Sequence, residues 1–102
     1  MWYVYADDGS KNTVKCEDTL KVAKLFDDPE YRKVWLTRLS EEVSVSTVFM
    51  MLDHSIRGDE PVLFETMVFG GQMDGYMRRY HTYDEAVEGH HETVATVCKG
   101  ED

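Results

Sequence analysis

The chain has 102 residues, of which 42% are hydrophobic, 12% aromatic and 30% charged. This composition is typical of one small folded domain and is too rich in aromatic residues for a disordered segment. Twenty Asp and Glu residues against 11 Lys and Arg residues give a net charge of −9. A field of this sign repels phosphate backbones, so the sequence disfavours direct binding to nucleic acid.

The length of the apolar segments excludes a membrane span. The longest apolar run, residues 48–52, is far shorter than the ~20 residues that cross a bilayer. The first residues lack the basic and apolar regions of a secretory signal, so we expect a cytosolic protein. Cys16 and Cys98 lie far apart in the chain and are expected to be free thiols in a reducing compartment. We expect a single domain over residues 1–102, with no cofactor.

The first 30 residues predict a hairpin followed by a short helix. Residues 2–5 favour a strand, residues 7–10 carry turn chemistry, and residues 13–15 can return antiparallel. Asp18 is a suitable N-cap, and apolar residues then recur at helical spacing. Because the residue before a proline avoids the α region, this helix is expected to end near Pro29.

The middle of the chain predicts four strands, in residues 32–39, 43–52, 62–69 and 76–81. The connections between them are too short for parallel crossovers, so neighbouring strands are expected to pair antiparallel in a meander. The expected fold class is α+β: an antiparallel sheet of about four strands plus the N-terminal hairpin, packed by two α-helices.

The last element is an amphipathic helix. Thr82 and Glu85 form a capping box, in which each side chain accepts a hydrogen bond from the other residue's backbone N–H. A single stripe of the helix then carries Tyr83, Ala86, Val87, His90, Val94 and Val97, and the helix is expected to end at Gly100.

The strand expected over residues 43–52 is apolar on both faces in its second half, since Val48, Met50 and Leu52 alternate with Thr47, Phe49 and Met51. One face can be covered by helices. The other must be covered by the N-terminal hairpin, by a second copy of the chain or by a target protein. Methionines suit an adaptable contact surface. The partner-binding residues expected from this pattern and from the acidic last helix are Met50, Asp84, Glu85, Glu88 and Glu92.

Histidines and carboxylates near the strand ends invite a test for acid–base or metal chemistry. The candidates for catalysis are Asp53, His54, Glu65 and His90. Adjacent residues on a strand point to opposite faces, so Asp53 and His54 share a site only if the strand bends. No metal-binding spacing is present. His90 on the apolar stripe is more typical of a core histidine, hydrogen-bonded to a buried carboxylate or carbonyl.

The remaining polar motifs predict structure instead of catalysis. Ser44, Ser46 and Thr47 lie within a strand and not at a nucleophile elbow. The two glycines at 70 and 71 most simply supply positive φ in a turn. Arg78 and Arg79 point to opposite faces of their strand, and one of them can bind Glu65 or a carboxylate of the last helix.

Three segments together resemble a family of small uncharacterised proteins encoded by tailed bacteriophages and prophages. They are residues 45–54, 61–71 and 79–90, and they contain the pattern STVF…LDH…LFETMVFGG…EA…GH. The resemblance covers roughly residues 31–97. It implies a phage gene expressed in a bacterial cytoplasm and implies no activity. It also marks Asp53, His54, Glu65 and His90 as positions to test.

The sequence therefore supports three hypotheses of different kinds. The leading one is a phage accessory protein without catalysis that binds a host or phage protein, for example to block a host-defence (anti-CRISPR-like) or other nucleic-acid-handling complex. The second is a small hydrolase that uses Asp53, His54, Glu65 and His90, with or without a divalent ion. The third is a homodimer with a structural or regulatory task.

Overall fold

A computed structural model describes residues 1–58 and 60–100 of the chain. In this part of the chain a two-stranded sheet and a four-stranded sheet are both antiparallel, and the four strands lie in sequence order. This arrangement confirms the predicted α+β class. The elements are β1 (Tyr3–Tyr5), β2 (Thr13–Lys15), α1 (Thr19–Phe26), α2 (Pro29–Arg32), β3 (Lys33–Arg38), β4 (Ser44–Phe49), β5 (Phe64–Phe69), β6 (Met77–Tyr80) and α3 (Tyr83–Gly100).

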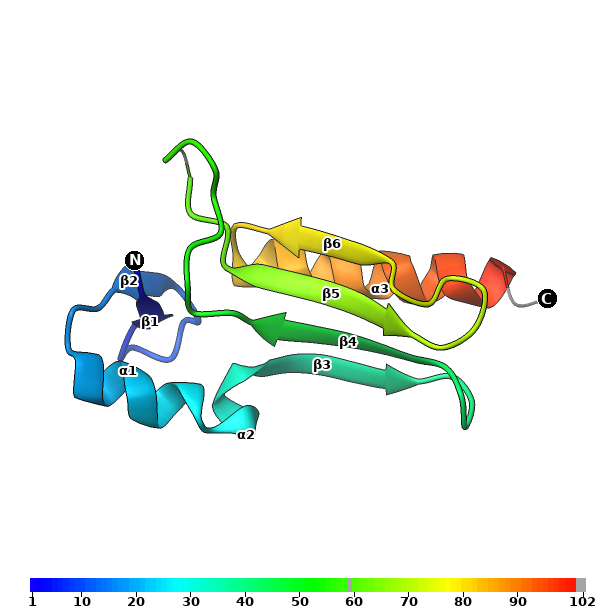
Figure 1. Ribbon diagram of the computed structural model, residues 1–102, viewed down its shortest axis with the longest axis horizontal. Coiled ribbons are helices and arrows are strands. Elements are labelled where there is room, and N and C mark those ends of the chain that lie inside the picture. The colour runs from blue at the N-terminus through cyan, green and yellow to red at the C-terminus, as the bar shows by residue number, and fades with distance from the viewer. Residues whose placement is uncertain (59, 101–102) are drawn as a thin grey trace.

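The main body of the molecule has two layers, a four-stranded meander and one long helix. Helix α3 runs behind the sheet and contacts all four of its strands (Figure 1). The hairpin β1–β2 and helix α1 lie together at one end of the molecule, beyond the ends of the strands (Figure 1). Of the two longer helices, α3 therefore covers the sheet, whereas α1 packs beside the N-terminal hairpin.

Helix α1 begins where the sequence predicts. The Asp18 carboxylate accepts a hydrogen bond from the backbone N–H of Lys21 at 3.1 Å, which caps the helix. Its buried residue is Val22, whereas Leu20 is 65% exposed. The predicted stop before Pro29 is confirmed, but a further turn, α2, follows it.

The strand predicted over residues 43–52 is shorter than expected. Strand β4 ends at Phe49, and Met51 then adopts a left-handed backbone with φ of 68°. After this bend the chain leaves the sheet and pairs with the N-terminal segment: the Tyr3 N–H donates to the Met51 carbonyl at 2.7 Å, and Trp2 bridges to Leu52. The N-terminal hairpin thus covers the apolar residues that follow β4.

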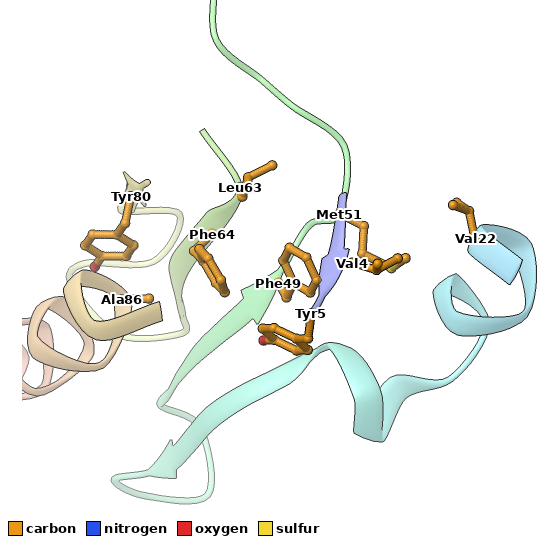
Figure 2. Close-up of a cluster of buried hydrophobic side chains, with 9 residues drawn as sticks. All are labelled: Val4, Tyr5, Val22, Phe49, Met51, Leu63, Phe64, Tyr80 and Ala86. Atoms are coloured by element: carbon orange, nitrogen blue, oxygen red, sulfur yellow. The ribbon is translucent and has the colours of Figure 1, made fainter. Parts of the chain in front are cut away.

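The main hydrophobic core lies between the N-terminal hairpin and α1 on one side and the sheet and α3 on the other. Tyr5 of β1 packs on Phe49 with ring centroids 4.4 Å apart, and Phe49 stacks on Phe64 at 5.0 Å. Figure 2 shows this aromatic group with Val22 reaching in from α1 and Ala86 from α3. A second buried cluster lies further along α3 and consists of Val43, Val45, Val68 and Val97.

The capping box of α3 is confirmed. The Glu85 N–H donates to Thr82 Oγ1 at 3.1 Å, and the Glu85 carboxylate accepts from the Thr82 N–H at 3.3 Å and from the His81 N–H at 3.0 Å. These bonds fix where the helix starts. The register of its buried residues against the sheet follows from that start.

Candidate functional site

His90 is a buried core histidine, as predicted, but its partners are hydroxyl groups. The side chain is fully buried between α3 and the sheet. Its Nδ1 lies 2.7 Å from Thr47 Oγ1, and its Nε2 lies 2.9 Å from Thr37 Oγ1. The expected buried carboxylate or carbonyl partner is therefore wrong. Two threonines from adjacent strands satisfy the ring instead.

The two threonines belong to a longer chain of hydrogen bonds. Thr47 Oγ1 lies 2.5 Å from Thr66 Oγ1, and the Tyr80 hydroxyl donates to Thr66 Oγ1 at 2.9 Å. The Tyr80 hydroxyl donates to Thr66. The hydroxyls of Thr66 and Thr47 then each find an acceptor within the network if Thr66 donates to Thr47 and Thr47 donates to Nδ1 of His90. The ring is then neutral and carries its hydrogen on Nε2, which donates to Thr37.

This chain of bonds makes protonation of His90 costly. Burial first, and the neighbouring His91 second, lower the pKa of His90 to about 4. A protonated ring would donate from both nitrogens, so Thr47 could no longer donate to Nδ1 and would have to turn its hydrogen toward another acceptor. The hydrogen-bond network therefore accommodates the neutral ring better than the protonated ring.

Gly89 allows Tyr80 to complete the network. A Cβ atom built on Gly89 would lie 2.2–2.4 Å from the ring and hydroxyl of Tyr80. Only a glycine leaves room for the phenol to cross the helix and reach Thr66. The pair Gly89-His90 of the sequence motif is thus explained by packing and hydrogen bonding inside the core.

Glu65 and His90, two of the four predicted catalytic residues, do not meet. Thr66 faces α3 through the His90 network, so its neighbour Glu65 points to the opposite face of the sheet. There Glu65 pairs with Arg79, with carboxylate oxygen and Nε 3.0 Å apart. Glu65 and His90 are therefore separated by the sheet. The convergence that a hydrolase would need is not present for this pair.

Asp53 and His54 lie in the loop after β4. The Asp53 carboxylate accepts hydrogen bonds from the backbone N–H groups of Ser55 at 2.8 Å and Val62 at 2.9 Å. These bonds, that from Ser55 first, outweigh desolvation and lower the pKa of Asp53. Asp53 thereby ties the two ends of the loop together. His54 is exposed beside it. Among residues 1–58 and 60–100, no group of three His, Cys, Asp or Glu side chains is placed to hold a metal ion.

The predicted partner-binding residues fall into two environments. Met50 is only 7% exposed and packs inside, so it offers little surface to a partner. Asp84, Glu85, Glu88 and Glu92 are exposed on α3, and the last three lie along its side next to β6. Of these, Glu85 completes the helix cap.

Both arginines of β6 have carboxylate partners. Arg78 pairs with Glu92 of α3, with Nη1 and Oε1 3.0 Å apart, while Arg79 pairs with Glu65 on the other face. The sequence predicted that one arginine binds Glu65 or a helix carboxylate and that the other is solvated. In the structure both carboxylates are bound, Glu92 by Arg78 on the face toward α3 and Glu65 by Arg79 on the opposite face.

The side of the four-stranded sheet that faces away from α3 is a surface that the sequence analysis did not single out. We call it the open face, and no described element packs over it (Figure 1). Leu36 is 45% exposed, Phe69 49% and Met77 45%. Val48 and Met67 lie on the same face and are half-buried between them. Exposed apolar side chains of β3, β5 and β6 thus lie on this face, with Ser44 and Ser46 of β4 between Leu36 and the other two.

The open face is also poor in acid, although the chain as a whole carries a net charge of −9. Its charged residues include the Glu65–Arg79 pair and Arg38, which lies beside Ser44 at the end of β3. Arg38 has no ion-pair partner among the described residues. The surface therefore has apolar side chains around the two serines of β4 and carries the unpaired Arg38 at its border.

Comparisons with known proteins place no further constraint on the site. The chain matches no family model, no curated protein and no solved structure. The resemblance to phage proteins stays a prediction. In the described part of the chain, no helix combines the length and the apolar character that crossing a membrane requires.

Proposed function

We propose that this chain is a phage-encoded binding protein without catalysis, which docks a protein partner on the open face of its sheet. The observation that carries the proposal is the apolar patch formed by Leu36, Phe69 and Met77 on a face that nothing in the described chain covers. Exposed apolar side chains on an uncovered sheet face suit a contact with another protein.

The patch supplies part of the apolar area that association needs. Three side chains of this size, each about half exposed, leave about 250 Å² accessible, and burying that area is worth about 6 kcal/mol before the costs of association. The partner we propose offers an apolar surface bordered by a carboxylate, which would pair with the free Arg38 guanidinium.

The resemblance to phage proteins and the charge of the chain support a partner class. We propose a host or phage protein of the bacterial cytoplasm, of the kind that handles nucleic acid. With the open face docked, the carboxylates of α3 would point away from the contact, on the opposite side of the sheet. Carboxylates held there would repel a nucleic acid that approaches the complex, which would inhibit its binding.

The experiment that tests the proposal is affinity capture from bacterial lysate, read by mass spectrometry, with matched variants. The wild-type chain is compared with Phe69→Gln/Met77→Gln on the open face. Leu20→Gln is the control, because Leu20 is a more exposed apolar residue on α1. We expect one stoichiometric partner with wild type and control and its loss with the open-face variant. Capture that is unchanged in the open-face variant would contradict the proposal.

Light scattering after size exclusion separates a foreign partner from a second copy of this chain. If the open face binds another copy, wild type elutes as a dimer and Phe69→Gln/Met77→Gln as a monomer. A monomeric wild type that still captures its partner through the open face supports a heterologous complex. A dimer that persists in the variant would assign self-association to another surface.

A further inference from the structure

Strand β3 forms one of the two edges of the four-stranded sheet, and no described element pairs with its outer side (Figure 1). Two large apolar side chains lie at its centre, since Trp35 is 43% exposed and Leu36 45%. The Trp35 ring packs on His91 of α3 with ring centroids 4.7 Å apart, whereas Leu36 lies on the open face. An uncovered edge with apolar residues at its centre is a template for pairing with another strand.

The register of β3 against β4 shows which backbone groups of this edge are free. The Leu39 N–H donates to the Val43 carbonyl at 2.9 Å, directly beyond the pair of Arg38 and Ser44. In an antiparallel ladder, the pair next to such a bond exchanges no bonds of its own, and bonded and unbonded pairs then alternate. The N–H and C=O groups of Arg38 and Leu36 therefore point away from β4. No described residue bonds to them.

The opposite edge, β6, is protected from strand pairing. Arg78 and Arg79 occupy its middle, and charged side chains on an edge strand disfavour the approach of another strand. Pairing of β6 with itself would also bring the arginines of two copies together. In β3, residues 34–37 are uncharged, so this edge lacks such protection at its centre. A bulge between Lys33 and Trp35 interrupts the ladder at one end, so the regular edge is short.

The two ends of the β3 edge carry opposite charge. Residues 30–33, where β3 begins, hold two cations and one carboxylate, whereas residues 38–42, where it ends, hold one cation and two carboxylates. Lys33 pairs with Glu30 of its own chain at 3.3 Å, but both side chains are exposed, so this pair is weak. Two identical strands that pair antiparallel place the start of each beside the end of the other. Each positive end then lies beside a negative end, which identifies a second copy of the chain as the partner.

We propose that two copies of this chain pair antiparallel through β3, around a two-fold axis at Thr37. Leu36 of each copy then lies opposite Arg38 of the second copy, and such a pair exchanges two backbone hydrogen bonds. On the side of the sheet that α3 covers, Trp35 lies beside Leu39 of the second copy. The two sheets become one, and the two open faces lie side by side on the same surface. The pairing does not depend on what the open face binds.

Exchange of single backbone amides with solvent, measured by NMR at about 0.15 M salt, tests the pairing. A contact this small falls below about 1,200 Å², so we expect a dimer at about 1 mM chain that dissociates on dilution. At about 1 mM the amides of Leu36 and Arg38 should exchange at least about tenfold more slowly than in the dilute monomer. The outward amides of β6, Met77 and Arg79, are the control and should exchange rapidly at both concentrations. Rapid exchange of Leu36 and Arg38 at about 1 mM would overturn the proposal.

The substitution Leu36→Pro tests the outward hydrogen bond through the dissociation constant of the dimer, measured by sedimentation. Because the Leu36 N–H does not bond to β4, Leu36→Pro removes this donor and keeps the ladder within the monomer. Leu36→Ala is the matched control, since it shortens the same side chain and keeps the donor. We expect Leu36→Pro to raise the dissociation constant at least about tenfold above that of Leu36→Ala, because both copies lose one bond. Equal constants for the two variants would contradict the pairing.

An exchange of charges tests the orientation and does not depend on whether proline is tolerated. Lys33→Glu places excess negative charge at both ends of the edge and should raise the dissociation constant several-fold. Lys33→Glu/Glu41→Lys restores opposite ends and should return the constant to within about twofold of the wild-type value. A variant that is only less stable would not be rescued in this way. Weakening that the second substitution does not reverse, or a wild type that sediments as a monomer at about 1 mM, would overturn the proposal.

Discussion

Acidification is expected to destabilise this protein through His90. The ring is fully buried, and burial lowers its pKa from about 6.5 to about 4. In the unfolded chain the same ring titrates near its ordinary value. Between about pH 6.5 and pH 4 the unfolded state therefore binds more protons than the folded state, so stability falls as the pH falls. Above about pH 6.5 the contribution is fully present.

The size of the effect follows from the pKa difference. A pKa difference of about 2.5 units lowers the free energy of unfolding by about 3 kcal/mol once the pH is below the pKa of His90 in the folded state. About 2 kcal/mol of this is already lost at about pH 5. Small domains are stable by only about 5–15 kcal/mol. The loss is therefore a measurable fraction of the whole.

Urea unfolding at several pH values measures this loss, with His90→Gln as the reference. The chain's carboxylates titrate in both proteins and cancel in the difference between them. We expect the advantage of wild type over His90→Gln to narrow by about 2 kcal/mol between about pH 7.5 and pH 5. A difference that is independent of pH, or an NMR titration that gives folded His90 a pKa near 6.5, would refute this reasoning.

Three further substitutions test the packing that surrounds the network and the sheet. Gly89→Ala drives a Cβ into the Tyr80 ring, so a change that ordinarily stabilises a helix should instead cost about 2–4 kcal/mol in urea unfolding. Gly70→Ala places a Cβ 1.7 Å from the Glu42 carbonyl oxygen at a φ of +83°, and thermal melting should show a loss of at least about 2 kcal/mol. Thr82→Ala removes one bond of the α3 cap and should cost about 1 kcal/mol, with faster amide exchange in the first turn. A stability equal to wild type in any of the three would contradict the corresponding contact.

Local chemistry predicted the elements well. The caps at Asp18 and Thr82 each depend on residues within three positions of the cap, and both were correct. The stop at Pro29 and the turn at Gly70 depend on single residues with narrow backbone preferences. Helix α2 was missed because one turn of helix has no periodicity to detect.

Contacts between residues far apart in the chain could not be predicted from the sequence in the same way. Nothing in the sequence shows that Thr37, Thr47 and Thr66 join one hydrogen-bond network with His90, because the network depends on the register of three strands. The bend at Met51 was missed for the same reason, since pairing with the N-terminal segment holds the left-handed backbone there. Because of this bend, the hairpin covers the segment after β4 and leaves the open face of the sheet uncovered.

The most direct test of the central claim uses the methionine methyl groups as reporters in the complex with the captured partner. Met67 and Met77 lie on the open face, whereas Met50 and Met51 are buried in the core. In a sample labelled with ¹³C at the methionine methyls, partner binding should shift the Met67 and Met77 signals and protect them from a paramagnetic solvent agent. The Met50 and Met51 signals should stay in place. If Met67 and Met77 remain accessible to solvent in the complex, the open face is not the docking surface and the proposed function is wrong.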